Sequence, residues 1–194
     1  MESYKKIIRG MLLTSATLCL ATFSFAQSSD QAGKVSAADK QFAMKAAQGG
    51  MAEVELGKLA ADKGKSDDVK QFGQHMVDDH SKANDQLKSV AQQKNITLPT
   101  DLSAKDKALK NKLSGMSGDQ FDKAYMAAMV KDHKTDIAEF QKEANSGKDS
   151  DIKNFASQTL PTLKDHLKMA QDANAKVSGT SSKKSSTSAS NMQH

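Results

Sequence analysis

Three histidines of the sequence, His80, His133 and His166, are spaced so that they could bind a metal ion. Each follows an aspartate inside an amphipathic helical stretch, and the first two end the same phrase, Met-Val-x-Asp-His. Each also interrupts the apolar stripe of its stretch, as Glu53 does in a fourth stretch, so these side chains should face the core. Imidazoles and a carboxylate that converge from four helices are ligands for a divalent metal. We therefore predict that Glu53, His80, His133 and His166 bind one divalent ion, zinc or manganese.

Four further side chains are candidates for a supporting role around this site. Asp79 and Asp132 precede their histidines and point about 100° away from them on a helix, so we expect them to accept hydrogen bonds from histidines of adjacent helices. His75 lies one turn before Asp79, and Asp136 lies one turn after His133. The alternative is a metal-free layer in which the same histidines and carboxylates only fix helix packing.

Other metal chemistries fit the sequence less well. A di-iron centre in a helical bundle needs a Glu-x-x-His motif on two helices, and the sequence contains none. Met76, Met126 and Met129 lie near the histidines, and thioethers suit monovalent copper. Methionine in a core with few aromatic residues more commonly fills space, so copper is disfavoured. No set of nucleophile, base and orienting residue is visible, and we predict no catalytic residues.

The sequence predicts four long helices, because apolar residues recur at steps of three and four and no stretch alternates with a period of two. Glycine-containing turns at 64–66 and 146–148 join them into two antiparallel hairpins, and a long connection at 95–118 separates the hairpins. We expect a short helix within this connection, at 103–113. The four helices are predicted at 38–63, from 66 to the connection, from 117–119 to 147, and from 149 to 177.

These elements indicate an all-α fold, a ferritin-like antiparallel four-helix bundle with a long connection between helices 2 and 3. An up-down-up-down bundle with a capping helix is the alternative. If the connection brings both hairpin turns to one end of the bundle, Glu53 and the three histidines fall into one layer near its middle.

The two ends of the chain are predicted to lie outside the bundle domain, 38–177. Residues 1–26 have the features of a signal peptide: a basic start, an apolar run and small residues before the cleavage point. Residues 27–37 are expected to be a flexible segment and residues 178–194 a disordered tail rich in serine and lysine. The protein is then exported, to the periplasm or the extracellular space.

The composition argues against several classes of partner. Arg9 is the only arginine, so the mature chain has no guanidinium group for phosphate or guanine, and nucleic acid is disfavoured. Cys19 is the only cysteine and leaves with the signal peptide, which excludes thiolate chemistry. No segment of the mature chain is long and apolar enough to span a membrane. An unknown protein or another envelope component is the expected partner, and the oligomeric state stays open.

Several motifs resemble a known bacterial family, domain of unknown function 4142. They are Gly-Gly-Met-Ala-Glu-Val-Glu-Leu-Gly at 49–57, Met-Val-x-Asp-His at 76–80, Leu98-Pro99, Met-Val-x-x-His at 129–133 and Leu-Pro-x-Leu-x-x-His at 160–166. The resemblance covers residues 38–175. It implies an exported ferritin-like helical bundle, often labelled an outer-membrane protein, without an established activity. A role in envelope or stress physiology is consistent with it.

Overall fold

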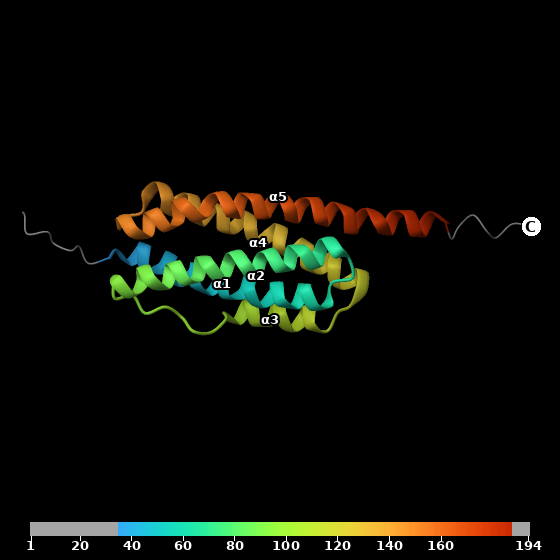
Figure 1. The fold of residues 1–194 in the computed structure, drawn as a ribbon, viewed down its shortest axis with the longest axis horizontal. Helices are drawn as coiled ribbons and strands as arrows, with labels where there is room; N and C mark the ends of the chain where they lie inside the picture. The colour runs from blue at the N-terminus through green and yellow to red at the C-terminus, as the bar shows by residue number, and fades with distance from the viewer. Residues whose placement is uncertain (1–34, 188–194) are drawn as a thin grey trace, which may run out of the picture. The chain divides into compact units, whose positions relative to one another are not determined.

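The computed structural model describes residues 35–187, and every regular element in that range is a helix (Figure 1). The chain order is α1 (Ala37–Lys63), α2 (Asp67–Gln93), α3 (Ala104–Ser114), α4 (Gly118–Ser146) and α5 (Ser150–Thr187). The prediction of an all-α fold is therefore confirmed for the described residues. The predicted signal peptide and nearly all of the segment 27–37 lie outside them.

Local capping chemistry explains where the helices begin and end. The Ser36 hydroxyl accepts a hydrogen bond from the Asp39 amide at the start of α1, and the Ser103 hydroxyl does the same for the Asp106 amide at the start of α3. Gly64 and Gly147 follow α1 and α4, and each donates its amide to a carbonyl four residues back. The predicted bounds of the first three long elements agree with these positions to within a residue or so.

Helix α5 continues past the position where the sequence predicted a disordered tail. Its backbone is helical to Thr187, ten residues beyond Val177. Val177 is the last buried side chain among those that the structure describes in this helix. Extending an existing helix by one residue costs far less than starting one, so the packed part of α5 supports the polar turns that follow it. Residues 188–194 of the predicted tail lie outside the described range.

The helices form a bundle from two hairpins. Helix α1 packs along α2 and α4 along α5, while contacts of α2 with α5 and of α1 with α4 join the hairpins. The connection 94–117 runs beside them, and its helix α3 contacts α1 and α4 (Figure 1). The α1–α2 turn and the α4–α5 turn lie at opposite ends of the bundle (Figure 1).

Hydrogen bonds at each turn confirm this arrangement. The Asp39 carboxylate, at the start of α1, accepts from the amides of Lys148 and Asp149 in the α4–α5 turn, at 3.2 and 2.8 Å. The Asp122 carboxylate, at the start of α4, accepts from the amides at 65 and 66 in the α1–α2 turn, at 2.9 and 2.8 Å. The condition considered in the sequence analysis, both turns at one end of the bundle, is therefore not met. The candidate residues still fall into one layer, because each lies near the middle of its helix and mid-helix positions coincide in either orientation.

Two glycines let α1 and α2 approach closely. A Cβ atom on Gly73 would lie 2.7 Å from the Gly57 carbonyl oxygen, and one on Gly57 would lie 2.7 Å from the Gly73 oxygen. Gly50 is similarly placed against Asn84 of α2, whereas a Cβ on Gly49 would meet nothing within 4 Å. The small residues of the 49–57 motif thus serve helix packing, but Gly49 has no part in it.

The buried apolar residues form two clusters, one toward each end of the bundle. The methionine cluster contains Leu56, Ala60, Val69, Phe72, Met76, Leu113, Phe121, Tyr125, Met126, Met129, Ala170, Ala173 and Val177. The aliphatic cluster contains Phe42, Ala43, Ala47, Leu87, Ala91, Ile96, Phe140, Ile152, Phe155, Ala156, Leu160 and Leu163. On each of the four long helices, the candidate site residue lies between the segments that supply the two clusters, so a polar layer divides the core.

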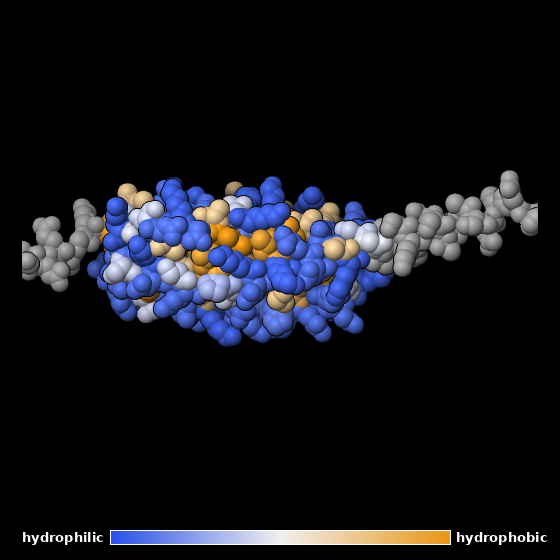
Figure 2. All heavy atoms as spheres, turned by 90° about the horizontal axis from the view of Figure 1, so that it is seen from above, coloured by the Kyte–Doolittle hydropathy of each residue, from blue (hydrophilic) through white to orange (hydrophobic). Residues whose placement is uncertain are grey.

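The face of the domain drawn in Figure 2 is mainly hydrophilic. The largest group of hydrophobic residues on this face lies around the middle (Figure 2). Met44 is the one large hydrophobic side chain that is exposed among the described residues. Within the described range, no helix combines the length and the apolar character that a membrane span requires.

Candidate metal centre

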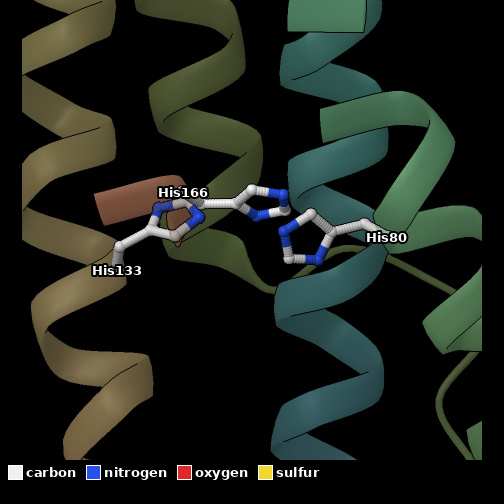
Figure 3. A group of neighbouring side chains, drawn as sticks. All are labelled: His80, His133 and His166. Atoms are coloured by element: carbon white, nitrogen blue, oxygen red, sulfur yellow. The ribbon is translucent and has the colours of Figure 1, made fainter. Parts of the chain in front are cut away.

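The three histidines converge from three helices on one point of the buried layer. His80 comes from α2, His133 from α4 and His166 from α5, and one ring nitrogen of each lies within 4.8 Å of the others (Figure 3). Their ring centroids are 5.3 to 5.9 Å apart. The residues are 6, 0 and 3 % exposed. The structure thus brings these three histidines together near the middle of the bundle.

Hydrogen bonds anchor two of the rings from outside the centre. His133 Nδ1 donates to the backbone carbonyl of Met129 at 3.0 Å. His166 Nε2 donates to Oδ2 of Asp79 at 3.1 Å, as predicted for an aspartate that reaches an adjacent helix. These bonds fix the tautomers, so that the second nitrogen of each ring carries a lone pair. Metal-bound histidines are commonly held in this way, by a carboxylate or a backbone carbonyl behind the ring.

The second ring nitrogens are buried without a partner. Among the described residues, none forms a hydrogen bond with His80 Nε2, His133 Nε2 or His166 Nδ1. A buried polar atom without a partner costs roughly 1–3 kcal/mol, so three such atoms in one cluster of histidines require an explanation. A metal ion at about 2.0–2.1 Å from each nitrogen would use all three lone pairs.

Burial keeps these rings neutral at pH 7. Desolvation is the main cause that lowers the pKa of His80 to about 3 and that of His133 to about 4, with a further lowering from the neighbouring histidines. Desolvation also lowers the pKa of His166, although Asp79 opposes this effect. Neutral imidazoles are the form that binds a metal, so the centre needs to lose no proton from these rings to accept one.

Glu53 lies in the same layer but does not converge with the histidines. It is 4 % exposed, and its Oε1 is 3.8 Å from His133 Nδ1, the nitrogen that faces Met129 rather than the centre. Its Oε2 has no hydrogen-bond partner among the described residues. Desolvation, reinforced by Asp136 and Asp132, raises the pKa of its carboxyl group well above the usual value.

The predicted supporting residues have different surroundings. Asp79 contacts His166, but Asp132 accepts from Lys105 Nζ of α3 at 3.2 Å instead of from a histidine. His75 is exposed and is not part of the cluster of three histidines. Asp136 lies beside Glu53 in a pocket between α1, α3 and α4. Burial, together with the charge of Asp132, raises the pKa of Asp136 to about 7.

Sequence reasoning missed one contact of the centre and most of this pocket. The Met129 carbonyl lies one helical turn before His133, so the shared Met-Val-x-Asp-His phrase contained the signal for it. Lys105 and Asp106 of α3 have no such signal, because only the packing of α3 against α1 and α4 brings them near Glu53.

A family model covers most of the chain. The model described as domain of unknown function (DUF4142) matches residues 24–173. The chain belongs to the DUF4142 family. The resemblance inferred from its motifs is thereby confirmed. No curated protein matches the sequence at a significant level.

Two solved structures resemble the fold of this DUF4142 protein. A DUF305 fragment from Deinococcus radiodurans has a TM-score of 0.66 at 11% sequence identity, and the match covers 74% of this chain and 99% of that one. A structure of CopM in the Cu(I)-bound form has a TM-score of 0.58 at 11% identity, covering 69% and 93%. At this identity the likeness concerns the fold alone.

Proposed function

We propose that this protein is an exported helical bundle that binds one transition-metal ion between His80, His133 and His166. The observation that carries the proposal is the cluster of three buried histidines, which offer one ring nitrogen each within 4.8 Å of one another and have one ring nitrogen each without a hydrogen-bond partner among the described residues. The bonds from Met129 and Asp79 hold two rings in the orientation that a metal needs. The role is binding rather than turnover.

The donor set favours zinc over manganese. All three converging atoms are imidazole nitrogens, which suit zinc, copper and nickel, whereas manganese prefers oxygen ligands. Glu53, the one carboxylate predicted as a ligand, contacts the far nitrogen of His133. The long connection that carries α3 supports a ferritin-like assignment of the fold, but the carboxylate motif of di-iron proteins is missing from the sequence.

Monovalent copper is the second candidate. Met76 lies one turn before His80 and Met129 one turn before His133, and both are fully buried in the methionine cluster. Thioethers are soft ligands that suit Cu(I). The similar structure of CopM was solved in the Cu(I)-bound form, which supports including this ion in the same test.

The alternative is a metal-free layer that only specifies helix packing. This alternative must account for three buried nitrogens without partners, and it predicts that apolar replacements of the histidines are neutral or stabilising. The metal proposal predicts that the same replacements abolish binding.

Metal titration of the mature chain without a histidine tag tests the proposal. We expect one equivalent of Zn²⁺ to bind and, at a free concentration about 100 times Kd, to raise Tm by about 5–10 °C. His133→Ala should weaken binding by more than about 100-fold, and His133→Leu, which keeps the core filled, should do the same.

His75→Ala is the matched control, because His75 is exposed on the same helix as His80 and lies outside the cluster. It should leave the affinity and Tm unchanged. Binding of less than half an equivalent of Zn²⁺ and of Cu⁺ by the wild-type chain, with no change of Tm in chelator, would refute the proposal.

A further inference from the structure

A pocket of about 340 Å³ opens beside the metal centre, between α1, α3 and α4. We call it the acidic pocket, because it is lined by five carboxylic side chains and two lysines. These side chains are Glu53, Asp106, Asp132, Asp136 and Glu139, with Lys45 and Lys105.

The two lysines are each engaged with one carboxylate. Lys45 Nζ lies 3.0 Å from Glu139 Oε1, and Lys105 Nζ lies 3.2 Å from Asp132 Oδ1. The remaining acids give the pocket an excess of carboxyl groups. A cleft with one predominant sign of charge and low-dielectric walls raises the local concentration of counter-ions and their rate of association.

Glu53 connects this pocket to the histidines. It lines the pocket although it is only 4 % exposed, so it forms part of its deepest surface. Its Oε1 is 3.8 Å from the His133 ring, and its Oε2 has no hydrogen-bond partner among the described residues. One carboxyl group thus borders the pocket and the centre, with an oxygen available to a cation.

The acidic pocket is not itself a finished chelating site. Among the described residues, the only group of three or more potential ligands whose atoms lie within 4.8 Å of one another is the set of three histidines. Hydrated cations can therefore collect at the pocket, but nothing in it surrounds a bare ion with closely spaced oxygens. This arrangement suits the passage of a cation through the pocket rather than its storage there.

We propose that the acidic pocket is the access route of the metal ion and that Glu53 passes the ion from the pocket to the three histidines. This inference rests on the proposed metal-binding function and names the path by which a hydrated divalent cation reaches that centre. The carboxylates at the mouth attract the cation and replace part of its water shell. Glu53 then carries it past the His133 ring, after which the imidazole nitrogens hold it.

Stopped-flow mixing with Co²⁺, whose visible absorption reports nitrogen ligation, tests the route. Asp132→Asn combined with Asp136→Asn should lower the association rate constant by about tenfold or more at low salt, with little change in the dissociation rate. Asp68→Asn combined with Asp172→Asn is the matched control. It removes the same number of carboxyl groups from a pocket of about 180 Å³ between α2 and α5 that holds neither Glu53 nor a clustered histidine, and it should change the rate by less than twofold.

Glu53→Gln separates passage from binding, because it keeps the size of the side chain. If Glu53 carries the ion, association and dissociation both slow by a similar factor and Kd hardly changes. If the variant instead speeds dissociation alone, Glu53 holds the bound ion and the access route is refuted. Equal effects of the Asp132/Asp136 and Asp68/Asp172 pairs would refute it as well. If the wild-type chain shows no Co²⁺ or Zn²⁺ binding at all, the metal-binding function itself fails.

Discussion

The two apolar clusters on either side of the histidine layer contain three aromatic residues each but differ in sulfur content. The methionine cluster buries Met76, Met126 and Met129 and has Met116 and Met169 at its edge, whereas the aliphatic cluster and its edge contain no methionine. Methionine adapts to irregular space, while branched aliphatic and aromatic side chains have few rotamers and fit one arrangement. The layer thus has one rigid side and one adaptable side.

This difference bears on how the centre could close on an ion. The ring nitrogens lie up to 4.8 Å apart, and bonds of about 2.0–2.1 Å to a shared metal require them to approach by about 1 Å. The aliphatic side fixes the helices, whereas Met76 and Met129 can move as the rings of the same turns shift. The following experiments test whether the two sides differ in this way.

The largest effect is expected from a cavity on the rigid side. Phe140 packs edge-on against Phe42 at 4.9 Å between ring centroids and lies 5.9 Å from Phe155. Phe140→Ala should lower the free energy of unfolding by about 3–5 kcal/mol in urea denaturation. Met126→Ala, a truncation on the adaptable side, should cost less, about 2–3 kcal/mol, because the neighbouring methionines can fill part of the cavity. Equal costs would mean that the clusters do not differ in rigidity.

A second test concerns the closest helix contact on the methionine side. Gly73→Ala would place a Cβ atom 2.7 Å from the Gly57 oxygen and 2.8 Å from the Ala61 nitrogen. Because both are backbone atoms, α1 and α2 must move apart, and we expect a loss of about 2–3 kcal/mol. Gly49→Ala is the control in the same bundle. It meets nothing within 4 Å, and helix propensity should make it stabilising by about 0.5–1 kcal/mol.

A third test distinguishes the histidine layer from the two apolar clusters, because only the histidine layer should make the stability of the protein depend on pH. The folded pKa values of His80 and His133, about 3 and 4, lie below the value of about 6.5 in an unfolded chain. As the pH falls, these two rings bind protons in the unfolded chain before they do so in the folded chain. Their contribution to the free energy of unfolding is therefore complete above about pH 6.5 and is lost as the pH falls toward 4.

Between pH 7 and pH 5, the wild type should therefore lose about 1–2 kcal/mol more than His80→Leu does, as measured by urea denaturation in chelator at each pH. Phe140→Ala should lower the free energy of unfolding by the same amount at every pH, so that its dependence on pH stays that of the wild type. A slope that is unchanged in His80→Leu would show that this ring titrates normally and is not buried as described.

The smallest structural effect is expected from Met76→Leu and Met129→Leu. Both replacements conserve volume, and each should cost less than about 1.5 kcal/mol. Zn²⁺ affinity should stay within about threefold of wild type, because zinc uses the imidazoles. A loss of more than about tenfold in Cu⁺ affinity, measured by competition with a Cu⁺ chelator, would show that thioethers reach the centre and would favour copper as the bound ion.

The sequence predicted the features that depend on neighbours along one helix. The period of the apolar stripes located α1, α2, α4 and most of α5, and it placed His80, His133 and His166 inside the bundle. Asp79 was also predicted to contact a histidine, since its direction from His80 follows from helix geometry alone.

The sequence did not predict the features that depend on how the helices assemble. Nothing local specifies that the hairpin turns lie at opposite ends or that Asp132 pairs with Lys105 of α3 instead of a histidine. The position of Glu53 behind the His133 ring depends on differences of a few ångströms in the approach of α1 to α4. The helical turns beyond Val177 follow from packing upstream and not from their own composition.

The reciprocal bonds of Asp39 and Asp122 have a consequence for how this protein reaches its native state. Each hairpin provides the carboxylate that completes the turn of the other hairpin. Before docking, these turn amides are left to water, so their protein partners form only when the two halves join, and this couples the folding of the halves although their contacts are mostly local. His80 belongs to one half and His133 and His166 to the other. The chain therefore assembles its histidine centre only at the step in which the two halves join.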